Sequence, residues 1–301
     1  MSATHLSKKD YLCALAVVVI WGLNFVVMKI GLKGLSPMML GALRFALAAF
    51  PLILFVRPPR LPWRWIAAYG LVQGLGQFGL LFTALKFGMP AGMASLVIQT
   101  QAFFTLLLAA PMLRERARPH HWAGLAVAAL GLAVIAAGRG EGPGQMTMVG
   151  FVVALGAAFM WGVANIMVRP GTRKAPGYDP FAFIAWSSAA PVLPFLALAV
   201  MADGWDAVAA MILGIGWGEA LSVLYLAVLA TLLAYTLWTQ LLTRHPAAKI
   251  APFSLLVPVV GLWAASAAFD EHLRPLQWAG AGCVLAGLVI NQVGGRWLRN
   301  R

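Results

Sequence analysis

The chain has 301 residues, of which 61% are hydrophobic and only 10% are charged. A water-soluble domain carries charge on about 25% of its residues, so this composition excludes a soluble enzyme or a soluble binding module. The 22 lysines and arginines outnumber the 9 acidic residues, but they fall in the gaps between long apolar runs, which indicates a membrane protein and not a nucleic-acid-binding one.

The first apolar run follows Lys8 and Lys9 and continues to about Met28. No A-x-A cleavage site followed by a soluble domain appears, so we interpret the run as a membrane helix and not as a signal peptide. About 20 apolar residues suffice for a helix to cross the hydrocarbon core. In chain order we expect ten such helices, at 11–30, 36–56, 65–86, 91–113, 119–138, 147–168, 180–201, 219–242, 247–269 and 275–294. The longest connection, near 202–218, has the composition of an interfacial segment.

The basic residues divide unequally between the two sides of this ten-helix arrangement. Sixteen of them lie at the termini or in the loops after helices 2, 4, 6 and 8, and five lie in the other loops. Loops rich in Lys and Arg face the cytoplasm. We therefore expect a multi-pass protein with both termini in the cytoplasm.

The second half of the sequence repeats the first. The opening helices match at an offset of 140 residues, with WGLNFVVMK at 21–29 and WGVANIMVR at 161–169. Later positions match at an offset of 156, and the matched pairs are Pro90 and Pro246, Ala91 and Ala247, Glu115 and Glu271, Arg118 and Arg274, Pro119 and Pro275, Trp122 and Trp278, Gly124 and Gly280, and Gly131 and Gly287. The extra residues fit the long connection near 202–218.

Each copy holds five helices, and because five is odd, the second copy enters the membrane from the opposite side. The sequence therefore predicts an all-α integral membrane fold of ten transmembrane helices, built as two inverted five-helix repeats over 1–146 and 147–301. Transporters with inverted repeats place the substrate near the midplane between the repeats and alternate access by rocking one against the other.

Polar side chains inside the apolar runs are the candidates for a binding site, because polar groups in hydrocarbon are costly and tend to face a bundle interior or a cavity. Several stand three or four residues apart, which places them on one helix face. Neutral amides and aromatic rings suit a small zwitterion with an apolar side chain. The alternative is that they join helices by hydrogen bonds. The predicted substrate-binding residues are Trp21, Asn24, Gln73, Gln77, Phe78, Gln99, Gln101, Trp161, Asn165 and Tyr235.

Arg44 is the only formal charge well inside a predicted span. Arginine at a helix centre costs about 2.5–3.5 kcal/mol on a translocon scale. It must therefore reach the interface, meet carbonyls or face water, and both a substrate carboxylate and a purely structural contact stay open as its partner. All 9 acidic residues lie in loops or at span ends. The lack of a mid-membrane carboxylate favours uncoupled or exchange transport, although other groups could still couple transport to protons.

No motif indicates a cofactor or a metal. GLGQFG at 74–79 fits G-x-G-x-x-G but lies inside an apolar helix, whereas a dinucleotide site needs a preceding strand. With Gly70 it contains G-x-x-x-G, which predicts close helix packing. No P-loop occurs, and neither the two cysteines nor the adjacent pair His120 and His121 makes a metal site. We therefore expect no catalytic residue, no cofactor and no metal.

Four runs resemble the EamA-type members of the drug/metabolite transporter superfamily: VVVIWGLNFVVMKIGL at 17–32, LRFALAAFP at 43–51, FGMPAGMASLVIQTQAFFT at 87–105 and APFSLLVPVVGL at 251–262. The resemblance covers essentially the whole chain. It implies a bacterial inner-membrane exporter of amino acids and related metabolites, working without ATP. Members of this kind release cysteine-pathway compounds such as O-acetylserine, and the related YddG-like proteins export aromatic amino acids. The resemblance implies no site residues.

Two other functions compete with this one. A broad-specificity drug/metabolite efflux pump driven by proton exchange would be favoured by a mid-membrane carboxylate. A membrane-embedded enzyme such as a prenyl transferase would need acids or histidines clustered near the membrane plane, and would lose activity with a chelator. We expect a transporter and not an enzyme, whose partners are a small-molecule substrate and the lipid bilayer, with no nucleic acid. Because both repeats lie in one chain, it can work as a monomer.

Overall fold

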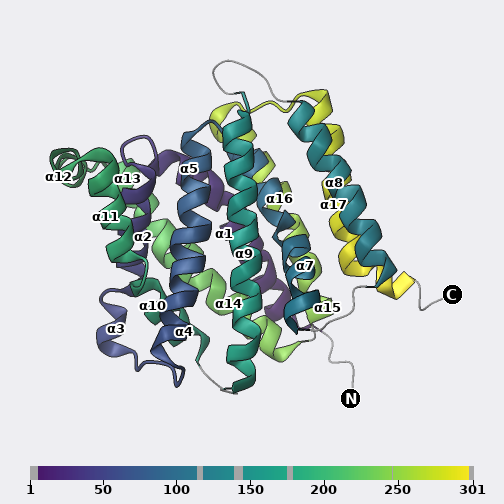
Figure 1. Ribbon diagram of the computed structural model, residues 1–301, viewed down its shortest axis with the longest axis horizontal. Helices are drawn as coiled ribbons and strands as arrows, with labels where there is room; N and C mark the ends of the chain where they lie inside the picture. Colours follow the sequence, from purple (N-terminus) through teal and green to yellow (C-terminus); the bar gives the residue numbers. More distant parts are fainter. Residues whose placement is uncertain (1–5, 114–117, 139–144, 175–178, 246, 298–301) are drawn as a thin grey trace.

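A computed structural model describes residues 6–113, 118–138, 145–174, 179–245 and 247–297 of the chain. Over these residues the protein is a bundle of helices without a β-strand (Figure 1). Ten segments are long and apolar enough to cross a membrane, and we number them spans 1 to 10: Lys8–Gly31, Pro37–Phe55, Trp63–Lys86, Ala91–Ala109, Pro119–Ala137, Met148–Val168, Pro180–Asp203, Trp217–Leu242, Ala251–Phe269 and Pro275–Gly294. The prediction of ten spans is confirmed, with ends that shift by a few residues.

Several spans are built from more than one helix. Spans 1, 5, 6 and 10 follow single helices, whereas the others change geometry or direction partway. The helices are α1 (Lys8–Gly31), α2 (Pro37–Ala49), α3 (Leu52–Phe55), α4 (Trp63–Gly70), η1 (Leu71–Gly79), α5 (Leu80–Lys86), α6 (Ala91–Val97), η2 (Ile98–Thr100), α7 (Gln101–Leu113), α8 (Pro119–Ala137), α9 (Met148–Lys174), α10 (Pro180–Ala189), α11 (Val192–Asp203), α12 (Trp205–Leu213), α13 (Trp217–Leu224), η3 (Tyr225–Leu233), α14 (Ala234–Arg244), α15 (Ala247–Ile250), η4 (Ala251–Leu256), α16 (Val257–Phe269) and α17 (Pro275–Trp297).

Irregular helix geometry recurs at matching places in the two halves. Spans 3 and 8 each contain a π-helical stretch, η1 and η3, and spans 4 and 9 each contain a 3-10 stretch, η2 and η4. The first helix of each half also begins in the same way: the hydroxyl of Ser7 accepts from the Asp10 N–H, and that of Thr147 accepts from the Gly150 N–H. Local π geometry frequently marks functional sites, so spans 3 and 8 are the first places to look for one.

Spans 5 and 10 pack together at one edge of the bundle (Figure 1). A Cβ on Gly124 would lie 2.6 Å from the carbonyl oxygen of Gly287, and a Cβ on Gly131 would lie 2.7 Å from that of Gly280. Only glycine permits such backbone contact between membrane helices. The earlier glycine of α8, Gly124, meets the later glycine of α17, Gly287, and the later glycine of α8, Gly131, meets the earlier glycine of α17, Gly280. The two helices therefore run antiparallel. The sequence repeat equates Gly124 with Gly280 and Gly131 with Gly287, so each contact maps onto the other when the halves are exchanged.

Gly131→Ala is expected to destabilise this helix pair by about 1–3 kcal/mol, because the added methyl group meets backbone that cannot move aside. Gly282→Ala on the same α17 is the matched control, since a Cβ there has nothing within 4 Å. It should be neutral or slightly stabilising, because alanine is the better helix former by about 1 kcal/mol. Thermal unfolding of the detergent-solubilised protein measures both, and equal midpoints would contradict the packing role of Gly131.

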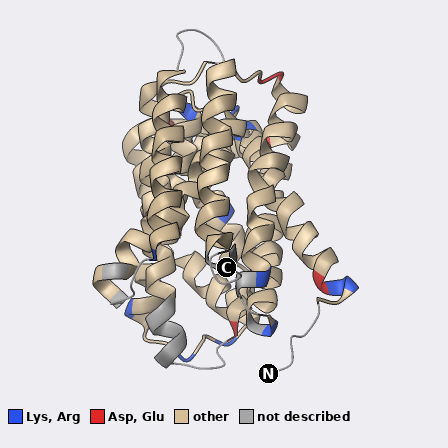
Figure 2. Cartoon of the chain, turned by 90° about the vertical axis from the view of Figure 1, so that its right-hand side faces the viewer, with Lys and Arg blue, Asp and Glu red and all other residues tan. Residues whose placement is uncertain are grey.

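The ends of the bundle are polar and its middle is apolar. Lys and Arg lie toward the two ends in Figure 2, and the intervening band of helix is nearly free of charge. The long connection predicted near 202–218 contains α12, and Trp205, Leu213 and Trp217 at its borders are 67%, 88% and 85% exposed. Exposed tryptophan at a span end suits the membrane–water interface, although the interfacial placement of this segment stays a prediction.

Candidate functional site

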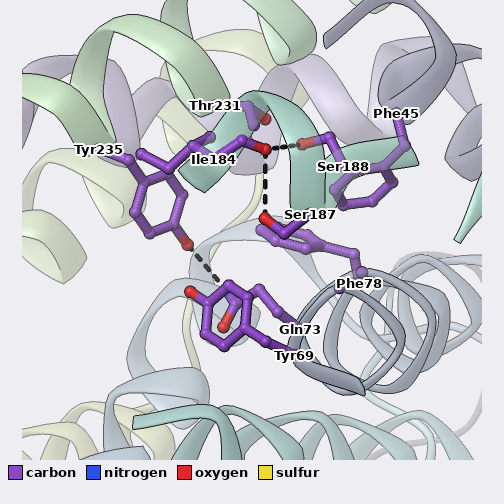
Figure 3. A pocket seen from close by; sticks show the side chains of 11 residues that line it. Phe45, Tyr69, Gln73, Phe78, Ile184, Ser187, Ser188, Thr231 and Tyr235 are labelled. Atoms are coloured by element: carbon purple, nitrogen blue, oxygen red, sulfur yellow. Dashed lines mark hydrogen bonds between the residues drawn. The ribbon is translucent and has the colours of Figure 1, made fainter. Parts of the chain in front are cut away.

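A pocket lies between spans 2, 3, 7 and 8 (Figure 3). The space between its lining side chains is about 330 Å³, a volume that includes open solvent at its mouth. It is lined by Phe45, Tyr69, Gly70, Gln73, Gly74, Phe78, Ile184, Ser187, Ser188, Thr231 and Tyr235. No lining residue is acidic, and four of them carry aromatic rings.

The pocket lies between the middle of the bundle and the end that carries the N-terminus. Among the elements that line it, α4, α10 and α14 occupy that half of the molecule in Figure 1. Gln73 follows the start of α4 by ten residues, which corresponds to about 15 Å along a helix axis. A membrane helix of this length spans about 30 Å of hydrocarbon, so Gln73 lies close to the midplane.

One wall of the pocket is a hydrogen-bonded chain of three polar side chains. The Gln73 Nε2 donates to Gln77 Oε1 at 2.5 Å and to the Tyr235 hydroxyl at 3.0 Å. Behind this wall, Trp21 lies edge-to-face on Tyr235 with ring centroids 5.0 Å apart, and its Nε1 donates to the Ala230 carbonyl at 3.1 Å. The side-chain NH₂ group of Gln73 thus donates both of its hydrogen bonds to protein groups. Its side-chain carbonyl oxygen can still accept a hydrogen bond from a ligand.

The opposite wall is made of hydroxyls from span 7. The Oγ atoms of Ser187 and Ser188 both donate to the carbonyl of Ile184, at 3.2 and 2.7 Å. Each hydroxyl therefore keeps its oxygen lone pairs for a further donor. Figure 3 shows the two serines facing Tyr69 and Gln73 across the pocket, with the rings of Phe45 and Phe78 to one side. Acceptor oxygens and ring faces suit an ammonium group, which donates hydrogen bonds and binds to aromatic faces.

Arg44 lies directly behind the part of the wall formed by Phe45, Phe78 and Thr231. It is 1% exposed, its Nε donates to Thr231 Oγ1 at 3.1 Å, and its guanidinium carbon lies 3.9 Å from the Phe78 ring centroid. Its Nη1 is buried and has no hydrogen-bond partner among the described residues. A buried cation without an anion is costly, and Arg44 is not itself among the residues that line the pocket.

Two glycines let spans 3 and 7 approach closely enough to form this pocket. A Cβ on Gly70 would overlap the carbonyl oxygen of Ser187, and a Cβ on Gly74 would lie 2.5 Å from Cγ of Pro191. The close packing that the G-x-x-x-G spacing predicts is therefore confirmed, and its partner is span 7.

The predicted site residues divide into those at the pocket and those elsewhere. Gln73, Phe78 and Tyr235 line it, and Gln77 and Trp21 support them from behind. The other five predicted residues, Asn24, Gln99, Gln101, Trp161 and Asn165, do not line it.

Three of those five make hydrogen bonds between spans. Asn165 Nδ2 donates to Gln101 Oε1 at 2.6 Å and to Thr105 Oγ1 at 3.2 Å, which joins spans 6 and 4. Gln99 Nε2 donates to the Ser254 carbonyl at 2.8 Å, which joins spans 4 and 9. These contacts are of the helix-joining kind that the sequence left open as the alternative. Asn24 differs, because its buried Oδ1 has no partner among the described residues.

The predicted substrate-binding residues leave out eight of the residues that line the pocket: Phe45, Tyr69, Gly70, Gly74, Ile184, Ser187, Ser188 and Thr231. Tyr69 is four residues before Gln73 and Phe45 is next to Arg44, so helical spacing could have added Tyr69. Ile184 carries no sequence signal, because one isoleucine in an apolar span resembles any other.

The described residues contain no group of three or more His, Cys, Asp or Glu side chains that could hold a metal ion. Cys13 and Cys283 are both free. The residues that line the pocket offer amide, hydroxyl and aromatic ring groups for binding, and the Arg44 guanidinium lies behind them against Phe78.

Comparison with known proteins places the chain among membrane transporters. The profile of the EamA-like transporter family matches twice, over residues 8–137 and 148–292. A protein of Salmonella typhimurium named "Probable amino-acid metabolite efflux pump" is 44% identical over 97% of this chain and 97% of its own length. One of Escherichia coli with the same name is 42% identical over the same shares.

Two further similarities are more distant. A "Probable terminal-alkyne amino-acid exporter" of Streptantibioticus cattleyicolor is 31% identical over 95% of this chain and 93% of its own length. A solved crystal structure resembles 96% of this chain and 98% of its own, with a TM-score of 0.55 and 19% sequence identity. That likeness shows the fold.

Proposed function

We propose that this chain, which belongs to the EamA-like transporter family, exports amino acids and related metabolites from the cytoplasm across the bacterial inner membrane. It is a multi-pass membrane protein by its ten spans and its family. The observation that carries the proposal is the full-length similarity to two relatives named as amino-acid metabolite efflux pumps. The third relative, also named an amino-acid exporter, supports the same substrate class.

The transport mechanism in this proposal is alternating access between two inverted five-helix repeats, with both termini in the cytoplasm. Three features support it. The family profile matches each half once, and π-helical and 3-10 stretches recur in the same order in both halves. The two glycine contacts between the antiparallel helices α8 and α17 also map onto each other when the two halves of the sequence are exchanged. The substrate pocket draws on spans 2 and 3 and on their repeat equivalents 7 and 8, as expected for a site between the repeats.

The pocket suits a zwitterion that carries no net charge. In this proposal Arg44, which lies behind Phe78 and Thr231, is the partner for the carboxylate, and the Gln73 carbonyl oxygen, the serine hydroxyls and the aromatic rings suit an ammonium group. The remaining surface is apolar, which suits a neutral side chain. Broad-specificity efflux of cationic drugs by proton exchange is less favoured, because no acidic residue lines the pocket.

Saturable uptake of neutral amino acids is expected in liposomes that contain the purified protein. The panel comprises labelled cysteine, O-acetylserine, phenylalanine, tryptophan, threonine, methionine and lysine, with and without a pH gradient. Uptake of some neutral members and little of lysine supports the proposal, and insensitivity to the gradient indicates uncoupled transport. Folded protein that carries no member of the panel would contradict the proposal.

Two matched amide variants connect such uptake to the pocket. Gln73→Met removes the acceptor oxygen that faces the pocket and should raise the half-saturation concentration roughly tenfold, the effect of one hydrogen bond to a charged group. Gln99→Met makes the same change outside the pocket and should leave that concentration unchanged. Equal effects of the two substitutions would show that this pocket does not bind substrate.

A further inference from the structure

A partly buried carboxylate joins the two halves of the chain at the end of the bundle opposite the N-terminus. Lys29 Nζ, in the last turn of α1, lies 2.7 Å from Glu271 Oε1, in the turn between α16 and α17. The same carboxylate accepts the backbone N–H groups of Ala91 and Gly92 at the start of α6, each at 3.0 Å. Glu271 therefore connects spans 1 and 4 of the first half to the turn between spans 9 and 10 of the second.

The environment of Glu271 makes this more than an ordinary surface ion pair. Its side chain is only 10% exposed, against 32% for that of Lys29. It has three donors, one of them charged, and charge-assisted hydrogen bonds are roughly twice as strong as neutral ones. The Lys29 ammonium also lies 4.6 Å from the centroid of the Phe269 ring. Exposed pairs contribute little to stability, whereas breaking a sheltered and fully bonded pair is costly.

Beneath Glu271, spans 1, 4 and 9 are packed without space between them. A Cβ on Gly22 of span 1 would lie 2.5 Å from Cβ of Val260 in span 9, and a Cβ on Gly261 would lie 2.5 Å from Cβ of Ser95 in span 4. Ser95 is fully buried, with 0% of its surface exposed. In this conformation the end of the bundle that bears Glu271 is therefore closed, whereas the pocket lies toward the other end.

Helix α1 connects the closed end to the pocket. Trp21 packs against Tyr235, which lines the pocket, and Lys29 is eight residues further along the same helix, or about 12 Å. A rigid movement of α1 that separates Lys29 from Glu271 would therefore also displace the ring behind the pocket wall.

We infer that Glu271, with Lys29 and the amides of Ala91 and Gly92, forms an outer latch that keeps the transporter closed to the outside while the pocket receives substrate from the cytoplasm. This inference rests on the proposed function and on its orientation in the membrane. Release of the outer latch separates spans 1, 4 and 9 and lets substrate leave. Glu271 is a positioning residue, because it acts on the helices and does not touch substrate.

The test measures access to Ser95 from each side of the membrane. In a Cys13→Ala, Cys283→Ala background, Ser95→Cys places one thiol in the closed region, and a membrane-impermeant thiol reagent is added to right-side-out or inside-out vesicles. Glu271→Gln removes the charge and one acceptor oxygen, and should raise the labelling rate from the outside by roughly tenfold or more. Lys29→Gln leaves the amide contacts in place and should raise it by roughly two- to fivefold.

Lys33→Gln is the matched control. Lys33 is exposed, follows Lys29 by one turn and faces the same Phe269 ring at 5.9 Å, so its loss should leave the labelling rate unchanged. Unchanged labelling in both latch variants, or faster labelling only from the cytoplasmic side, would overturn the inference. General unfolding would raise labelling from both sides equally and count against it. The labelling assay needs no substrate. Its result can therefore be interpreted even if no amino acid is taken up in the liposome experiment.

Discussion

Arg44→Met is expected to abolish transport of substrates with a free carboxylate while the protein stays folded. Truncating one partner of a buried charge pair costs about 2–5 kcal/mol, so transport at limiting substrate should fall roughly 100-fold or more. Stability should be unchanged or higher, because an arginine in hydrocarbon is itself unfavourable by about 2.5–3.5 kcal/mol. Thr231 keeps its own hydrogen bond to the Leu226 carbonyl at 2.8 Å when Arg44 is absent.

Two measurements separate substrate binding from a structural role. Binding of a transported amino acid is compared with binding of its amide, in the wild type and in Arg44→Met. If Arg44 binds the carboxylate, the wild type prefers the acid strongly and the variant does not distinguish the two. Arg57→Met is the control, since Arg57 is exposed. Loss of thermal stability in Arg44→Met, with the preference for the acid retained, would show that Arg44 is structural.

Gly70→Ala is expected to lower stability by roughly 3 kcal/mol, at the upper end of the usual cost of overpacking, and to reduce transport more than tenfold. The added methyl group would overlap the backbone carbonyl oxygen of Ser187, and a backbone atom cannot rotate away as a side chain does. Spans 3 and 7 must then separate, which moves the serine wall away from Gln73. The expected effect on transport therefore exceeds that of removing one hydrogen bond.

Gly76→Ala tests whether the effect depends on that contact. Gly76 lies in the same span, within the π-helical stretch η1 that follows Gly70, but its nearest neighbours are flexible Met160 side-chain atoms, the closest at 3.2 Å. This control should keep near-normal transport and a nearly unchanged midpoint of thermal unfolding in detergent. If the two variants behave alike, the intolerance belongs to span 3 as a whole and not to the contact between Gly70 and Ser187.

The ten spans could be predicted from sequence because the property that defines them is local. A run of apolar residues long enough to cross hydrocarbon forms a helix wherever it lies in the chain, since every backbone polar group must bond within the segment. The same holds for the G-x-x-x-G spacing of Gly70 and Gly74, which marks a close helix contact without identifying the partner helix. The distribution of Lys and Arg between the loops likewise predicts the orientation of the chain in the membrane. That orientation stays a prediction.

The site could be predicted only in part, because polarity within a span does not say which helices meet. Gln73 and Gln99 are both amides in apolar spans, yet one lines the pocket and the other bonds to the Ser254 carbonyl. The difference arises from which neighbour each side chain faces, and no local pattern contains that information.

The sequence by itself determined the membrane class, the number of spans, the internal repeat and the unusual position of Arg44, since each depends on composition or on spacing along one chain. Only the tertiary structure decided that spans 2, 3, 7 and 8 enclose a pocket, that Arg44 lies behind Phe78 and Thr231, and that Glu271 connects to Lys29. These contacts join residues up to 242 positions apart. They depend on which helices pack together. Because the spans are all similarly apolar, that packing is determined by glycine contacts and by the fit of side chains between spans.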